Sequence, residues 1–269
     1  MSPAAPAVSI VVPVFNEVPT PQDDSFSPRI LNLLALIRPQ DEIILVDGGS
    51  NDYSWPTLQA LSNDPQVSAI QSGKGRALQM NTGAEHTRGE LLLFLHADTV
   101  LNETAWLDFL GKADPDSWGR FDVQIEGRSM WLPVVAWFMN QRSALSKIGT
   151  GDQALFLGRE LFQKVGGFPL QPLMEDIQLC KNLKQLAPDQ FLAIHSKVLT
   201  SGRRWDQNGA WKTILLMWRF RYRYWRGVSA QELARQYADT REKLKMTVAV
   251  FAKYPEAGRV KTRLQPLLG

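Results

Sequence analysis

The sequence predicts an α/β fold in which a mostly parallel central sheet is flanked by helices. The clearest sign is an uninterrupted apolar run at residues 91–95, because a strand buried on both faces shows no alternation. A second sign is the β-branched run at residues 8–14. A third is the alternation of such runs with helical segments up to residue 98, which is typical of parallel βα units.

The first half of the chain is expected to hold four strands and three helices. Three of the strands end in acidic residues, namely Glu17, Asp47 and Asp98. Ligands of open α/β sheets bind beyond the carboxyl ends of the strands, so these acids predict a binding site. The expected strands cover residues 8–14, 42–46, 67–70 and 91–95, and the expected helices cover residues 29–37, 53–61 and 77–86.

The 91–95 strand ends in two polar side chains one residue apart, His96 and Asp98. A carboxylate there can hold a divalent cation that in turn holds a phosphate. The structural alternative is that Asp98 caps a helix starting near Asn102 and that His96 is a buried core histidine. Lys74 and Arg76 lie at the start of the 77–86 helix, where free backbone N–H groups favour a phosphate.

The second half of the chain is less regular. Glu175 and Asp176 open a helix, where acids also interact favourably with the helix dipole. A flexible polar loop is expected at 149–153, and the apolar segment 130–139 is too short to span a bilayer. Further strands are expected at 121–126, 154–157 and 191–200, and further helices at 159–165, 177–186 and 211–226.

The 211–226 helix is amphipathic, with tryptophans at every seventh position. One face is expected to pack on the core, and the other to cover the sheet or contact a membrane surface. The tryptophan face holds Trp211, Leu215, Trp218, Tyr222 and Trp225, the opposite face holds Leu216, Met217 and Phe220, and Arg219, Arg223 and Arg226 flank one seam.

The composition is that of an ordinary globular protein, with 44% hydrophobic and 21% charged residues. The net charge of +3 comes from residues 246–269 alone, so the rest of the chain is neutral. That balance argues against a nucleic-acid partner. The single cysteine, Cys180, excludes an internal disulfide, and we expect no secretory signal at the start of the chain.

Five segments in register resemble a family-2 glycosyltransferase with the GT-A, Rossmann-like fold. Two further segments, 95–99 and 200–205, resemble one bacterial subfamily that is encoded beside radical-SAM proteins and linked by name to arsenosugar biosynthesis. The five segments are Ile-Val-Val-Pro-Val-Phe-Asn-Glu at 10–17, Ile-Leu-Val-Asp-Gly-Gly-Ser-Asn-Asp at 44–52, Asn-Thr-Gly-Ala at 81–84, Phe-Leu-His-Ala-Asp at 94–98 and Glu-Asp-Ile-Gln-Leu at 175–179.

The resemblance implies a role for each matching residue. Asp98 stands where the last acid of the family's Asp-x-Asp motif sits and would bind Mg²⁺ or Mn²⁺. His96 replaces the first acid of that motif, so its direct ligation is left open. Asp176 would be the general base, with Glu175 beside it. The nucleotide sugar would contact Pro13, Glu17, Asp47, Lys74, Arg76 and Ala97, and the acceptor or diphosphate region would include Asp152, Arg203, Arg204 and Trp205.

The function implied is an inverting, metal-dependent transfer of a sugar from a nucleotide donor to a hydroxyl acceptor, in arsenosugar or related glycoside biosynthesis. One alternative is a lipid or polyprenyl acceptor at the membrane surface, and another is a non-catalytic nucleotide-sugar-binding scaffold. A sugar-nucleotide pyrophosphorylase would have a long Gly-rich N-terminal loop, which residues 16–19 do not form. The expected location is cytoplasmic, with the inner membrane surface as the alternative.

The end of the chain carries a second resemblance. Residues 246–251 predict a strand, and residues 253–264 are similar to the opening of a different transferase family with a nucleotidyltransferase-like fold, encoded in the same gene neighbourhoods. A whole domain cannot fit in this segment. We therefore predict a transferase domain at 1–245 and the truncated start of a second domain at 246–269, as in a fusion protein.

Overall fold

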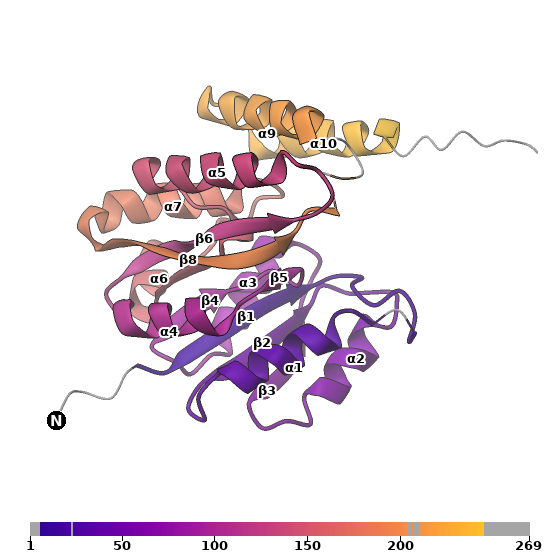
Figure 1. Ribbon diagram of the computed structural model, residues 1–269, viewed down its shortest axis with the longest axis vertical. Coiled ribbons are helices and arrows are strands. Elements are labelled where there is room, and N and C mark those ends of the chain that lie inside the picture. The colour runs from indigo at the N-terminus through magenta and orange to yellow at the C-terminus, as the bar shows by residue number, and fades with distance from the viewer. Residues whose placement is uncertain (1–5, 23, 204–205, 207–209, 245–269) are drawn as a thin grey trace, which may run out of the picture. The chain divides into compact units, whose positions relative to one another are not determined.

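An eight-stranded mixed sheet forms the centre of the fold in the computed structural model (Figure 1). Its strand order is β3-β2-β1-β4-β7-β6-β8-β5. The strands are β1 (Val8–Val14), β2 (Glu42–Asp47), β3 (Val67–Gln71), β4 (Leu91–Phe94), β5 (Thr99–Val100), β6 (Trp118–Glu126), β7 (Leu155–Gly158) and β8 (Phe191–Ser201).

The sheet is mostly parallel, as the sequence predicts. Strands β1 to β4 run parallel to one another, and β7 lies antiparallel between β4 and β6. Strand β8 is parallel to β6, while the short β5 is antiparallel to β8. Because Phe94 at the end of β4 pairs with Leu155 at the start of β7, the loop before β7 lies at the same edge as the ends of β1, β2 and β4.

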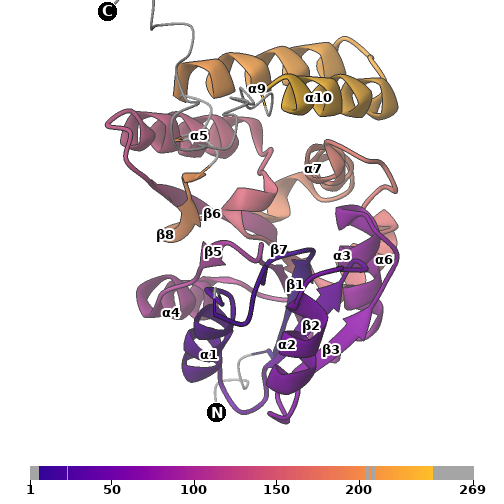
Figure 2. The ribbon, with the colours of Figure 1, turned by 90° about the vertical axis from the view of Figure 1, so that its right-hand side faces the viewer.

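Helices cover both faces of the sheet (Figures 1 and 2). One buried cluster joins the sheet to α1, α2, α4 and α5, and a second joins it to α3, α6 and α7. The helices are α1 (Ser27–Leu36), α2 (Ser54–Leu61), α3 (Arg76–Glu85), α4 (Glu103–Lys112), α5 (Leu132–Ser146), α6 (Arg159–Val165), α7 (Glu175–Leu186), α9 (Ala210–Trp225) and α10 (Ala230–Leu244).

Local sequence signals set several helix ends. The Asn102 side chain caps α4 by accepting a hydrogen bond from the Ala105 N–H at 2.9 Å. The capping alternative considered for Asp98 is therefore wrong, and that carboxylate is not used to start a helix. Helix α6 ends at Gly166, whose φ of 81° is the left-handed conformation that glycine adopts without steric cost.

The 81–84 segment is structural. A Cβ at Gly83 would overlap Val11 and Val46, so glycine lets α3 pack directly on β1 and β2. Asn81 donates a hydrogen bond to the Phe168 carbonyl and accepts one from the Phe168 N–H, both at 2.8 Å. The 81–84 segment therefore fixes α3 against the sheet and against the loop that precedes α7.

The second half differs from the prediction in the bounds of its elements and in one loop, and it contains two elements that the sequence does not predict, β5 and α10. Strand β6 begins at Trp118, three residues earlier than expected, and residues 132–139 of the apolar segment belong to the 15-residue helix α5. The loop predicted to be flexible at 149–153 contains a 3₁₀ turn, Gly151–Gln153, in which Gln153 is fully buried. Its amide donates a hydrogen bond to the Ser143 hydroxyl at 2.9 Å, which fixes the loop against α5.

The structure describes residues 6–22, 24–203, 206 and 210–244. The chain divides into two compact units, Met1–Ala234 and Arg235–Gly269. The boundary expected at residue 245 stays a prediction, and the strand expected at 246–251 lies outside the described residues. Among the described helices, none has the length and apolar character needed to cross a membrane.

Candidate functional site

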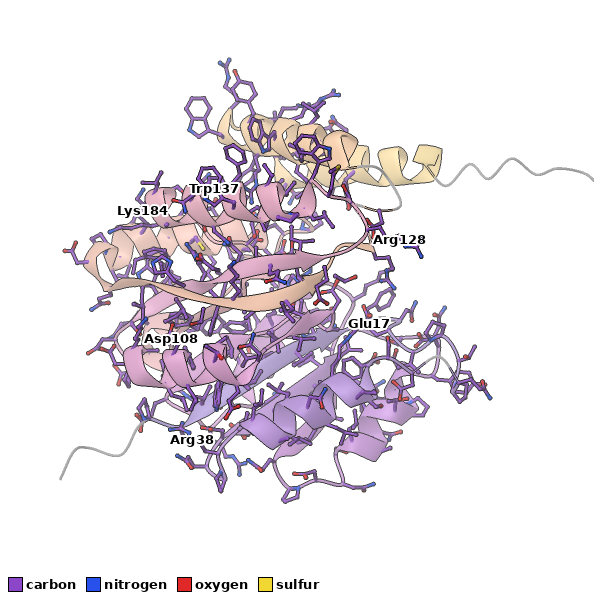
Figure 3. All side chains as sticks on the ribbon, viewed as in Figure 1. Glu17, Arg38, Asp108, Arg128, Trp137 and Lys184 are labelled. Atoms are coloured by element: carbon purple, nitrogen blue, oxygen red, sulfur yellow. The ribbon has the colours of Figure 1, made fainter. Side chains whose placement is uncertain are left out.

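The acidic ends of β1, β2 and β4 meet at one edge of the sheet, as the sequence predicts. Figure 3 shows Glu17 at the edge to which the strands point, with Asp108 and Lys184 at the opposite edge. Helix α3 starts there after β3, and α7 starts there at Glu175. This edge therefore collects acids from three strands and from a helix start.

Asp47 is fully buried and anchors the turn after β2. Its carboxylate accepts hydrogen bonds from the Gly49 and Ser50 N–H groups at 3.2 Å and from the Gln71 side chain at 3.3 Å. The turn is further held because Gln79 donates to the Val14 carbonyl at 2.7 Å and to the Val46 carbonyl at 2.9 Å. A buried, oriented carboxylate beside a glycine turn suits a hydrogen bond to a nucleoside.

Glu17 and Asp98 form an acidic pair at the ends of β1 and β4. Burial raises the pKa of Glu17, and the nearby charge of Asp98 raises it further. The positive charges of Arg203 and Arg29 oppose that shift. Arg29 also donates to the Ala97 carbonyl at 3.0 Å, so it braces the chain just before Asp98. Sequence reasoning missed Arg29, because a basic residue on a surface helix carries no motif.

His96 lies between Asp152 and Gly151. Its Nδ1 is 3.4 Å from an Asp152 carboxylate oxygen, and its Nε2 is buried without a hydrogen-bond partner among the described residues. A Cβ on Gly151 would overlap the imidazole, so the ring packs directly on that glycine. The ring therefore supports the loop before β7.

Asp176 lies in the first turn of α7 and belongs to the same site. One of its carboxylate oxygens accepts a hydrogen bond from the Gly151 N–H at 2.9 Å, and the other accepts one from the Ile177 N–H at 2.7 Å. Glu175 is buried, and its Oε1 lies 3.6 Å from an Arg76 nitrogen. Burial raises the pKa of Glu175, and the neighbouring Asp176 raises it further.

Arg76 is the cation that these acids share. Burial lowers the pKa of its guanidinium, but the charges of Glu175, Asp152, Asp176 and Asp98 outweigh burial and the pKa is raised. Half of the Arg76 side chain is exposed at the mouth of the site. The predicted metal acid, the predicted base and the predicted diphosphate residue therefore act on one another electrostatically.

Two arginines that sequence reasoning missed also approach Asp176. Burial and the nearby charge of Arg221 lower the pKa of Arg142 to about 10, while Asp176 opposes that shift. Burial likewise lowers the pKa of Arg221, again against the charge of Asp176. Arg142 comes from α5 and Arg221 from α9, so both helices supply positive charge to the second half of the site.

The remaining predicted residues lie as follows. Pro13 is in β1, in register with Val46 of β2, and Lys74 holds its ammonium 4.6 Å from the centre of the Phe15 ring. Arg203 follows β8 at the same edge of the sheet. Arg204 and Trp205 lie outside the described residues.

The carboxylates of the site can hold a divalent cation only when oxygen atoms of a bound ligand complete the coordination of the cation. Among the described residues, no group of three or more His, Cys, Asp or Glu side chains is arranged to hold a metal. Mg²⁺ is usually held by one or two carboxylates together with phosphate oxygens and waters. The mutual repulsion of Glu17 and Asp98 fits this arrangement, because a cation there would neutralise it. Asp98 thus fits as a single carboxylate ligand.

A sequence model of the family described as Glycosyl transferase family 2 matches residues 9–159. A protein of Mycobacterium tuberculosis named an uncharacterized glycosyltransferase is 27% identical over 174 residues, which cover 62% of this chain and 64% of that protein. The undecaprenyl-phosphate 4-deoxy-4-formamido-L-arabinose transferase of Yersinia pestis is 35% identical over 95 residues, covering 34% and 28% of the two chains. The chain spans less than two thirds of either relative.

Solved structures share the fold at low sequence identity. The mannosyltransferase PcManGT from Pyrobaculum calidifontis, in complex with GDP-Man and Mn²⁺, has a TM-score of 0.57 and 21% identity, and the match covers 81% of this chain and 61% of that one. S. aureus TarS 1–349, in complex with UDP-GlcNAc, has a TM-score of 0.54 and 14% identity, covering 72% and 58%.

Proposed function

Because the chain belongs to glycosyl transferase family 2, we propose that it moves a sugar from a nucleotide-sugar donor to a hydroxyl acceptor, with inversion and with a bound divalent cation. Membership of this family implies a glycosyltransferase that uses a nucleotide-sugar donor. The observation that carries the proposal of metal-dependent transfer with inversion is the set of four carboxylates around Arg76, among them Asp98 and Asp176.

The donor would bind along the ends of β1 and β2. Asp47 would accept hydrogen bonds from the nucleoside, with Glu17 and Pro13 lining the same pocket. Lys74 and Arg76, at the start of α3, would face the diphosphate. Positive groups held in place there stabilise the charge that develops on the leaving group. Ala97 would contact the donor next to Asp98.

The cation would be Mn²⁺ or Mg²⁺, held by Asp98 and by the donor diphosphate. Such an ion supplies charge neutralisation to the departing nucleoside diphosphate. The Mn²⁺ in the related Pyrobaculum structure supports the assignment. His96 would act on the cation only indirectly, because its Nδ1 faces Asp152 and its Nε2 is buried against Gly151.

Asp176 would take the proton of the acceptor hydroxyl. Each of its oxygens accepts a hydrogen bond from one backbone N–H, and each has a further lone pair that can accept a hydrogen bond from the hydroxyl of the acceptor substrate. The two backbone hydrogen bonds hold the carboxylate in one orientation, which general base catalysis requires. Glu175 would serve by pairing with Arg76, and Asp152 and Arg203 would border the acceptor or the diphosphate.

Two acceptor classes follow from the sequence. The 95–99 and 200–205 segments support an acceptor in arsenosugar or related glycoside biosynthesis, in a bacterial cytoplasm. The arginines of α5 and α9 near Asp176 favour the alternative of an acceptor that carries negative charge, such as a lipid or polyprenyl phosphate at the inner membrane. A non-catalytic binding scaffold would retain donor binding without donor hydrolysis in the presence of Mn²⁺.

A thermal-shift screen of nucleotide sugars with and without Mn²⁺ tests the donor half of the proposal. A donor at about 100 times its Kd adds about 2.7 kcal/mol to the free energy of unfolding. We expect a shift that requires both the nucleotide sugar and the cation. A screen in which no nucleotide sugar stabilises the chain would contradict the proposal.

Asp176→Asn tests the base. We expect unchanged donor binding and a turnover lowered by about 10²-fold or more, as for a lost general base. Asp189→Asn, an exposed acid near the other end of α7, is the matched control and should retain full turnover. If Asp176→Asn keeps most of the turnover, the base is elsewhere, with Glu175 and Asp152 the next candidates.

A further inference from the structure

The outer face of α9 is apolar and exposed. Leu215, Trp218, Tyr222 and Trp225 follow one another at intervals of three or four residues, so they form one stripe along the helix. Their exposed fractions are 65%, 63%, 58% and 72%. Large side chains this exposed and this regularly spaced are unusual on a surface that faces only water.

Arginines border the stripe on one side. At 100° per residue, Arg219, Arg223 and Arg226 lie on a single seam next to the stripe. Residues 210–226 contain no Asp or Glu, so the charged side chains of the helix itself are all basic. The outer face of α9 therefore combines tryptophan, tyrosine and arginine, the side chains found where a protein meets the headgroups of a bilayer.

Helix α5 adds a second apolar strip at the same end of the domain. Figures 1 and 2 both show α9 lying next to α5, and Figure 3 shows Trp137 on α5. Trp137 and Phe138 are 56% and 55% exposed, and Val134, one turn earlier, is 43% exposed. The Trp137 and Phe138 rings pack edge to face with their centres 4.9 Å apart.

We propose that the outer faces of α9 and α5 form a docking surface for a bilayer that contains anionic phospholipid. The aromatic rings would enter the headgroup region, and the arginines would hold lipid phosphates at its rim. The match of an acid-free, arginine-bordered stripe to a negatively charged surface favours a bilayer over a second copy of this chain, because two copies would bring like charges together.

The inner face of α9 ties this surface to the catalytic region. The Tyr224 hydroxyl donates to the Gln178 side chain at 2.7 Å and accepts from Gln171 at 3.2 Å. Gln178 lies two residues after Asp176 on α7, and Arg221 approaches Asp176 from α9. In a docked chain, α9 would lie between the headgroups and the start of α7, where Asp176 is.

Co-sedimentation with vesicles tests the surface. The full chain is mixed with vesicles of phosphatidylcholine alone or of phosphatidylcholine with one third phosphatidylglycerol. We expect binding to the second composition and at least about tenfold weaker binding for W218A/W225A. The matched control L31A/L107A removes two exposed apolar side chains from α1 and α4 and should bind like wild type.

The contribution of the arginine charges to vesicle binding is tested with separate variants. R219Q/R226Q should weaken binding to the anionic vesicles by about tenfold or more, because each arginine near such a surface contributes several-fold. K164Q/K197Q removes the same charge from other surfaces and should have no such effect. Raising the salt concentration should reproduce the loss, since the attraction is screened.

Three results would overturn the inference. The first is sedimentation of the wild type with neither vesicle composition, and the second is binding of W218A/W225A as strong as that of the wild type. A wild-type dimer in ultracentrifugation that W218A/W225A converts to a monomer would assign the face to a second copy of the chain. Nucleotide-sugar binding by W218A/W225A in vesicle-free buffer separates these results from a failure of the proposed function, because that binding should stay unchanged.

Discussion

The two halves of this domain are built differently around the same sheet edge. Residues 8–98 form parallel βα units whose strands end in Glu17, Asp47 and Asp98. Residues 99–226 contain the antiparallel strands β5 and β7, and they carry their polar groups on a loop and on helices. In the first half, a residue's place in the site follows from where a strand ends. In the second half, it follows from hydrogen bonds between distant segments.

The difference shows in how each half holds its key carboxylate. Asp98 lies in the short turn that follows β4, four residues after Phe94, and Arg29 braces the preceding carbonyl. Asp176 is oriented by the Gly151 N–H, and the loop that contains Gly151 is itself fixed by buried Gln153. We therefore expect the first half to tolerate changes outside the strand ends, and the second half to be sensitive to changes in its loop.

The largest effect should come from Asp98→Asn in the first half. An amide brings no charge to the cation, so we expect metal-dependent donor binding to weaken by far more than about tenfold. Calorimetry of nucleotide-sugar binding with and without Mn²⁺ measures the loss. Asp116→Asn, an exposed acid away from the site, should bind like wild type. If Asp98→Asn keeps the Mn²⁺-dependent affinity for the nucleotide sugar, Asp98 is not a ligand of the cation.

A comparison with His96→Ala sharpens this result. His96 stands where the family motif has an acid, but its ring is packed between Asp152 and Gly151. We expect His96→Ala to affect metal-dependent binding less than Asp98→Asn does. Equal losses in both variants would make His96 a ligand.

Gly151→Ala should give the next largest effect, in the second half. The new methyl group would overlap the His96 ring, and the loop would have to shift. Overpacking of this kind costs about 1–3 kcal/mol, and the shift would move the N–H that orients Asp176. We expect turnover to fall by about tenfold with donor binding retained, measured as kcat against KM and as Tm.

Gly111→Ala is the matched control for that variant. Gly111 lies in α4, and a Cβ there would meet no atom within 4 Å. Alanine in a helix is at least as favourable as glycine, so stability should hold or rise. Full turnover in Gly151→Ala would mean that the loop does not position the base.

The same contrast explains what the sequence could predict. The strands and the acids of the first half follow from apolar runs and from what comes after them, and the predicted α/β fold is confirmed. Arg120 interrupts the apolar pattern at the start of β6 although it is fully buried, because it pairs with Asp122 of the same strand. Burial of a charged pair leaves no periodic signal, so the apolar pattern predicts the start of β6 three residues too late.

Arg142 and Arg221 show the same limit within the site. Each lies in a helix whose exposed residues are rich in aromatics, and nothing in the local pattern points to Asp176. Their approach to Asp176 depends on how α5, α7 and α9 pack. The orientation of α9 could be predicted in part, because Phe220 is buried and the tryptophan stripe is exposed.

A smaller effect is the release of a proton from Glu17, in the first half, when the cation binds. The raised pKa of Glu17 means that the metal-free chain keeps a proton on this carboxylate to a higher pH than an ordinary glutamate does. A cation at Asp98 favours the charged carboxylate and lowers the pKa of Glu17, so binding should release a fraction of a proton. Calorimetry in two buffers with different ionisation enthalpies measures that release.

Glu17→Gln should bind the cation without this proton release at the same pH. Because the pKa of Glu17 is raised, the free energy of unfolding also depends on pH. The protonated, partly buried Glu17 contributes stability below its usual pKa, and that contribution is lost as the pH rises through the raised value. The wild-type chain should therefore lose stability relative to Glu17→Gln as the pH rises above the usual glutamate pKa and through the raised one. Proton uptake on cation binding would contradict the pairing of Glu17 with Asp98.

The smallest effect should come from removing residues 246–269, which belong to neither half. The predicted boundary assigns them to the start of another domain, whose own sheet would be needed to pair the 246–251 strand. The second compact unit begins at Arg235 and includes residues 246–269. We expect the truncated chain to keep its Tm and its nucleotide-sugar affinity, measured beside the full chain under identical conditions. A loss of more than about 2 kcal/mol in the free energy of unfolding would show that the segment is integral to the transferase domain.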